Sequence, residues 1–135
     1  MEKVLDRFLR YVSVDTQSNE ESESQPSAEK ELNLLRMLRD ELQALGVEAT
    51  LDEYGYVMGS IPSNIEAKVP AIGFIAHVDT APDMSGADVK PHVIENYDGK
   101  DIRLNAGVTM KVADFPELSF FKGHTLIHTD GTTLL

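Results

Sequence analysis

The residues best suited to chemistry in this sequence are a histidine and an aspartate, His77 and Asp79, which end the apolar run in FIAHVDT. Residues i and i+2 of an extended strand point to the same side, so this imidazole and this carboxylate can face one cavity. The imidazole can donate a ring nitrogen to zinc, and a nearby carboxylate can orient the imidazole and raise its basicity. The pair therefore suits a metal site.

The spacing of the pair is a weak signal by itself, because many His-x-Asp sequences have no catalytic role. Its position at the end of a buried strand strengthens the signal, since open α/β sheets bind ligands at the carboxyl ends of their strands. The alternative is a simple strand terminus, where Asp79 caps the following turn through the backbone of Thr80 and Ala81. The residues alone leave both interpretations open.

The remaining histidines and the usual motifs give less support to a site. His92 and His124 are expected near turns and strand starts, where a solvated histidine needs no function, and His128 lies within a short apolar strand and can point outward. Asp130 and Gly131 predict a tight turn. The chain has no GxGxxG, GxxxxGK[ST] or GxSxG pattern, so nucleotide binding and serine hydrolysis have no support.

Two helices and a pair of strands are predicted in the first half of the chain. Apolar residues at three- and four-residue steps indicate an amphipathic helix over residues 4–12 that packs on a core. A second helix is expected after an exposed loop over residues 17–27, with Ser27 as N-cap and Gly46 as C′ residue. The stretches VEATLD and YGYVMGSIP then predict a hairpin or two neighbouring strands.

The stretch from Val69 to Ala76 predicts the central strand of the fold. AIGFIA has no polar side chain, as expected for a parallel strand that is covered on both faces. Such a strand between helices indicates an α/β fold with an open, mostly parallel or mixed sheet. Further along, PHVIENY, IRL and TLIHT predict strands, and residues 116–122 predict one short helical turn stopped by Gly123.

Composition limits the class of protein. The chain has 135 residues, 41% of them hydrophobic, which suits one globular domain, and its net charge of -11 disfavours nucleic acids and anionic membrane surfaces as partners. It contains no cysteine, so a metal would need histidine and carboxylate ligands. The N-terminal residues are too charged for a secretory peptide, and no segment has the apolar length of a membrane span. We therefore expect a cytoplasmic protein.

Three segments carry a resemblance to a known family: YVSVDTQS, VPAIGFIAHVDTAPD and TLIHTDGTTLL. Together they resemble the N-terminal part of the peptidase T family, bacterial tripeptide aminopeptidases among the two-zinc metallopeptidases related to the aminoacylases. The resemblance implies a zinc-dependent enzyme that releases the N-terminal residue from tripeptides. It also implies that His77 is a zinc ligand and that Asp79 is a catalytic residue of the active site.

The resemblance further implies that residues 1–135 are the N-terminal portion of a truncated catalytic domain. In the family, the remaining ligands of the two zinc ions, the glutamate general base and the smaller lid domain used for dimerisation lie beyond the position of Leu135. We therefore expect two zinc ions and a homodimer only for the full-length protein, and an inactive chain when these residues are alone. The alternative is a non-catalytic acidic α/β domain that serves as an interaction or folding unit.

Overall fold

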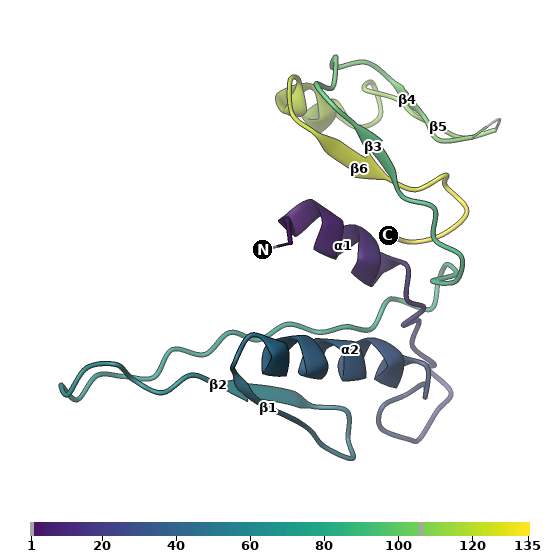
Figure 1. The fold of residues 1–135 in the computed structure, drawn as a ribbon. Coiled ribbons are helices and arrows are strands. Elements are labelled where there is room, and N and C mark those ends of the chain that lie inside the picture. The colour runs from purple at the N-terminus through teal and green to yellow at the C-terminus, as the bar shows by residue number, and fades with distance from the viewer. Residues whose placement is uncertain (1, 106) are drawn as a thin grey trace. The chain divides into compact units, whose positions relative to one another are not determined.

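The computed structural model describes residues 2–105 and 107–135, and it divides into two compact units (Figure 1). One unit joins Met1–Asp15 to Asp83–Leu135, and the other comprises Thr16–Pro82. Both units contain helix and strand, so the predicted α/β class is confirmed. No helix in the described part of the chain is long and apolar enough to cross a lipid bilayer.

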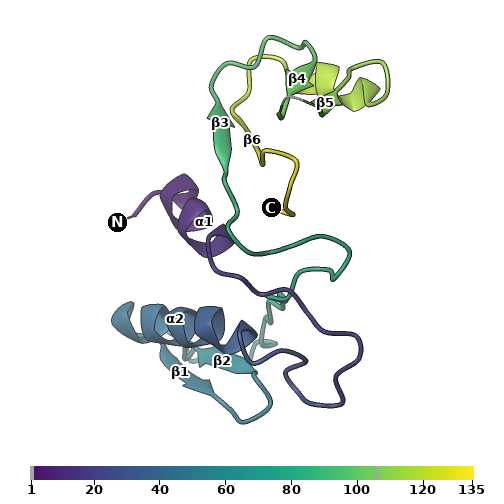
Figure 2. The same ribbon diagram turned by 90° about the vertical axis from the view of Figure 1, so that its right-hand side faces the viewer.

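In the unit of residues 16–82, one helix lies across an antiparallel hairpin (Figures 1 and 2). The helix is α2 (Glu31–Ala44), and the strands are β1 (Glu48–Leu51) and β2 (Val57–Ser60). Leu34 and Leu35 are buried on the helix, and Ala49 is buried on the hairpin. A Cβ atom at Gly59 would lie 3.4 Å from the Leu42 side chain of the helix. Glycine at this position therefore allows the helix and the hairpin to pack closely.

Helix α2 has the predicted C-terminus but begins later than predicted. Gly46 follows the helix with a φ of 81°, the left-handed conformation that glycine adopts without strain. Ser27 does not cap the helix; its hydroxyl donates to the carboxylate of Glu31 over 2.7 Å, and the backbone N–H of Ala28 donates to the same carboxylate over 2.9 Å. Glu31 is only 6% exposed. The two hydrogen bonds that its carboxylate accepts fix residues 27 and 28, which lead into the helix.

The other unit contains one helix, two short antiparallel ribbons and a 3₁₀ turn. Its elements are α1 (Val4–Val12), β3 (His92–Ile94) paired with β6 (Leu126–His128), β4 (Ile102–Arg103) paired with β5 (Thr109–Met110), and η1 (Pro116–Phe121). Its core is formed by Tyr97, Ile102 and Leu118. The predicted strands and the short turn before Gly123 are therefore confirmed, whereas β5 was not predicted.

The helix over residues 4–12 is present, but its predicted packing is not. None of the residues of α1 is buried, and Val4 is 86% exposed. On the polar side, Arg10 contacts the carboxylate of Glu2 over 2.7 Å, and this hydrogen bond holds the pKa of Glu2 below its ordinary value. The prediction of a helix was right, and the prediction of core packing is wrong for the described chain.

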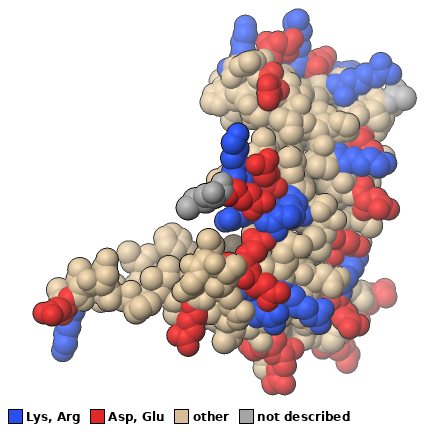
Figure 3. Space-filling model, viewed as in Figure 1, with Lys and Arg blue, Asp and Glu red and all other residues tan. Residues whose placement is uncertain are grey.

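The predicted central strand from Val69 to Ala76 is not formed. These residues are extended, but within the described chain they belong to no strand. Ile72, Phe74 and Ile75 are 84%, 95% and 101% exposed. In Figure 3 the arm of the molecule that extends past β1 and β2 carries few charged side chains. A strand needs a neighbour to bind its backbone groups and a layer to cover its side chains. The described residues provide neither along this segment.

The hydrogen bonds of Glu31 give a testable prediction for stability. Glu31→Ala removes the carboxylate that accepts hydrogen bonds from the Ala28 N–H and the Ser27 hydroxyl. We therefore expect the free energy of unfolding to fall by about 1–3 kcal/mol. The matched control is Glu29→Ala, an exposed position where a change of less than about 0.5 kcal/mol is expected. Urea unfolding followed by helical circular dichroism measures both, and equal stability of the two variants would contradict the role of Glu31.

Candidate active site

His77 and Asp79 point toward one another, as the alternation of an extended segment predicts. The Nδ1 of His77 lies 3.0 Å from the Oδ1 of Asp79, and their side chains are 83% and 47% exposed. An ionised carboxylate only accepts hydrogen bonds, so the imidazole donates its proton from Nδ1. In the neutral ring Nε2 then keeps its lone pair, which makes it the nitrogen that can bind a metal ion.

The backbone that carries Asp79 is held by residues far away in the sequence. Thr80 donates from its N–H to the carbonyl of Thr16 over 3.1 Å, and its own carbonyl accepts from the N–H of Ser18 over 3.0 Å. These bonds form an isolated parallel bridge between Gln17 and Thr80. This bridge lies beyond the predicted strand of Val69–Ala76, and the sheets of the described residues are three antiparallel pairs, so the predicted mostly parallel sheet is not formed within the described chain.

Side chains of the same distant residues strengthen this attachment. The hydroxyl of Thr16, a residue that is only 3% exposed, donates to the carbonyl of Val78 over 2.7 Å. The side-chain amide of Gln17 donates to the carbonyl of Pro82, and the hydroxyl of Ser18 to the carbonyl of Thr80. No spacing in the sequence identifies these positioning residues, although all three lie in the segment YVSVDTQS.

The alternative role of Asp79 as a turn cap has no support in the structure. The carboxylate accepts from the imidazole of His77, and among the described residues it accepts no hydrogen bond from the backbone N–H of Thr80 or Ala81. The adjacent hydroxyl of Thr80 is buried and has no hydrogen-bond partner within residues 2–105 and 107–135.

The pair fits one zinc ligand and its supporting carboxylate. Histidines that bind zinc almost always donate their second ring nitrogen to a carboxylate or a carbonyl, as His77 does here. The described residues contain no group of three or more His, Asp or Glu side chains that could hold a metal ion. Within the described residues the arrangement can thus offer a single nitrogen to a metal ion.

The other candidates belong to the unit that contains Asp83–Leu135, and each has surroundings of its own there. His124 packs edge-on against Phe121, and His92 stacks on His128 in the ribbon of β3 and β6. Asp130 forms the predicted turn with Gly131, which has a φ of 80°. Hydrogen bonds from the hydroxyl and the N–H of Thr132 hold the pKa of Asp130 below its ordinary value.

Comparison with known proteins decides the relationship that the three segments suggested. No protein-family model matches the chain. The peptidase T of Macrococcus caseolyticus is 53% identical over 134 residues, and those of Desulfitobacterium hafniense and Bacillus subtilis are each 56% identical over 137 residues. The chain is homologous to peptidase T.

The similarity to peptidase T covers nearly all of this chain and only part of each relative. It includes 99% of the chain for the Macrococcus caseolyticus and Bacillus subtilis proteins and 100% for the Desulfitobacterium hafniense protein. The chain spans about a third of the length of the curated relatives it matches, 33% in each of these cases. The suspected resemblance to peptidase T is confirmed, and it extends through both units described above.

The hydrogen bond between the two site residues predicts a preferred proton position on His77. In the unchanged chain the neutral imidazole should carry its proton mainly on Nδ1, and Asp79→Ala should shift the proton toward Nε2 because the acceptor is lost. Nitrogen-15 chemical shifts of the imidazole measure this preference. The nitrogen-15 shifts of His124 should not change in Asp79→Ala. Unchanged nitrogen-15 shifts of His77 in this variant would contradict the observed pairing.

Proposed function

We propose that these 135 residues belong to a tripeptide aminopeptidase that depends on zinc and that His77 is one of its metal ligands. The observation that carries the proposal is the hydrogen bond between His77 and Asp79, found in a chain that is 53–56% identical to three peptidase T proteins. The homology supports a peptide as the substrate, and the prepared Nε2 supports a metal ion as the cofactor.

In this proposal each residue has a defined role. His77 donates Nε2 to the metal, and Asp79 holds the imidazole in the orientation and tautomer that this donation needs. The hydrogen bonds from Thr16 and Ser18 keep the segment of Asp79 in place. When bound, zinc supplies a Lewis acid for the scissile carbonyl and lowers the pKa of a bound water.

The proposal requires further groups that the described residues do not include. A catalytic zinc has about three protein ligands and an open position, and the described chain offers His77 as one. We therefore propose that a longer protein supplies the other ligands and the general base, and that the 135-residue chain alone does not hydrolyse tripeptides. A second zinc ion, a homodimer and a cytoplasmic location are further parts of this proposal and are supported by the family resemblance.

The roles of the two residues can be separated in the full product of the gene. His77→Ala should lower the zinc content by the ion of the active site and abolish turnover, because it removes a direct ligand. Asp79→Asn keeps the side-chain volume and removes the negative charge, so zinc affinity should fall by about ten- to a hundredfold while turnover at saturating zinc falls further. Zinc content after dialysis and the release of the N-terminal residue from a tripeptide measure the two effects.

The matched control is His124→Ala, since His124 packs against Phe121 in the other unit and has no part in the proposed site. It should retain zinc and turnover. Full turnover in Asp79→Asn would show that the carboxylate is only structural. Full zinc content in His77→Ala would exclude His77 as a ligand, and an inactive gene product would favour the alternative of an interaction or folding unit.

A further inference from the structure

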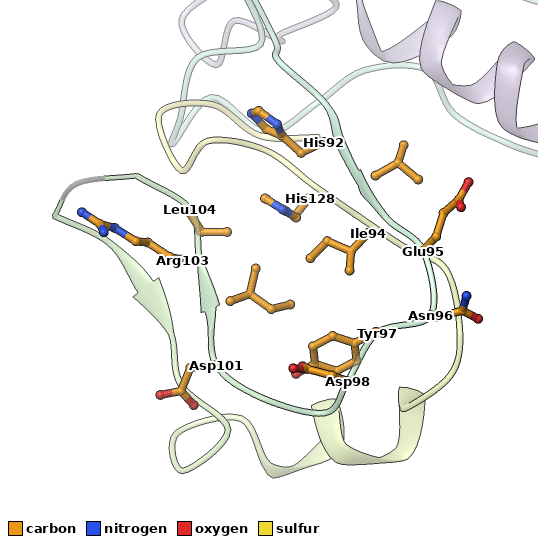
Figure 4. Close-up of a pocket in the computed structure, with 12 residues that line it drawn as sticks. His92, Ile94, Glu95, Asn96, Tyr97, Asp98, Asp101, Arg103, Leu104 and His128 are labelled. Carbon is orange, nitrogen blue, oxygen red and sulfur yellow. The ribbon is translucent and has the colours of Figure 1, made fainter.

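His92 and His128 occupy directly opposite positions on two paired strands. They are register partners in the antiparallel ribbon of β3 and β6, so their side chains lie on the same face. Their rings are stacked, with centroids 5.3 Å apart and an angle of 19° between the ring planes. Figure 4 shows both imidazoles at one end of an open pocket in this unit.

The hydrogen bond of His128 leaves one of its ring nitrogens ready for a metal ion. Its Nδ1 lies 2.6 Å from the carbonyl oxygen of Thr129, and because a carbonyl only accepts, Nδ1 carries the proton. In the neutral ring Nε2 therefore keeps its lone pair. This arrangement, with one nitrogen on a backbone carbonyl and the other unprotonated, is typical of histidines that ligate metals.

The second imidazole is able to adjust to a shared ligand. His92 is exposed, and neither of its ring nitrogens has a hydrogen bond or an ion pair in the described part of the chain. Two nitrogens that bind one zinc ion lie about 2.0–2.1 Å from it, so they must approach within about twice that distance. Rings whose centroids are 5.3 Å apart can reach this by rotation of the exposed side chain.

We propose that His92 and His128 form a two-imidazole binding site for a divalent transition-metal ion of the class of Zn²⁺, Ni²⁺ and Cu²⁺. Imidazole is a preferred ligand of these ions. Because the described residues place no third histidine or carboxylate with the pair, water completes the coordination. The site is independent of the function proposed above, since neither histidine has a role in it.

The charges next to the pair do not oppose a bound cation. Two residues outside the ribbon, Lys90 and Asp130, form an ion pair in which Nζ and Oδ2 lie 3.6 Å apart. The carboxylate of Asp130 thus offsets the ammonium group of Lys90. Within the ribbon the next pair on the same face is Ile94 and Leu126, which pack on the apolar core. A metal ion on the two imidazoles would therefore meet no unbalanced ammonium charge from Lys90.

A bound ion would act as a clip between two segments that are distant in the sequence. β3 and β6 are joined through the long stretch that contains β4, β5 and η1, and their ribbon is only three residue pairs long. Linking His92 to His128 holds the two ends of this long stretch together and opposes separation of the two strands. An ion that binds only the folded chain raises its stability.

The test titrates the 135-residue chain with Zn²⁺ alone by calorimetry, in a His77→Ala background that removes the other candidate ligand. In that background His128→Ala should weaken zinc binding by more than about tenfold. Loss of a residue that only supports a ligand already costs about that much, and loss of the ligand itself should cost more. His92→Phe keeps a stacked ring without ligating nitrogens and should have the same effect. His124→Ala, an exposed histidine of the same unit, should leave binding unchanged.

Thermal unfolding provides a second measurement that does not depend on the calorimetry. Zn²⁺ should raise the Tm of the His77→Ala reference and of the His124→Ala variant, but not of the variants at His92 and His128. The proposal is overturned if the reference does not bind zinc, if His92→Phe binds as tightly as the reference, or if only one of the two histidines matters. Similar circular dichroism spectra without metal establish that each variant is folded.

Discussion

The backbone bonds between Thr80 and residues 16–18 determine where the candidate active site lies. They join two segments that are distant in the sequence, and such contacts must offset the entropy lost when the intervening loop is closed. The buried hydroxyl of Thr16 adds a bond to the carbonyl of Val78, directly between His77 and Asp79. Asp79, next to this attachment, is the less exposed of the pair, and His77 is the more exposed.

On the other side of His77 the described residues give the chain no comparable support. Ile72, Phe74 and Ile75 are almost fully exposed, although burial of one such side chain stabilises a fold by about 1.5–3 kcal/mol. An apolar segment with unpaired backbone groups is suited to pairing with another strand. The peptidase T relatives are about three times as long as this chain, so they contain additional segments that could cover the equivalent residues.

The elements that could be predicted from the sequence are those determined by nearby residues. Gly46 and Gly123 end their helical segments because glycine tolerates a positive φ, and the hairpin of β1 and β2 follows from local alternation. The direction of His77 toward Asp79 also depends only on the period of an extended chain. The strand predicted at residues 69–76 is not formed, because its formation depends on partners outside the local segment. The same applies to Thr16, whose role exists only through a contact with Val78.

The most direct test of the proposed metal centre is a crystal structure of the zinc-loaded gene product, with anomalous scattering data collected at the zinc edge. If His77 is a ligand prepared by Asp79, a zinc peak should lie about 2.0–2.1 Å from Nε2 of His77. Nδ1 of the same ring should still donate to Asp79. A fully loaded protein with no zinc at His77, or with zinc on Nδ1 in place of the aspartate, would contradict the proposal.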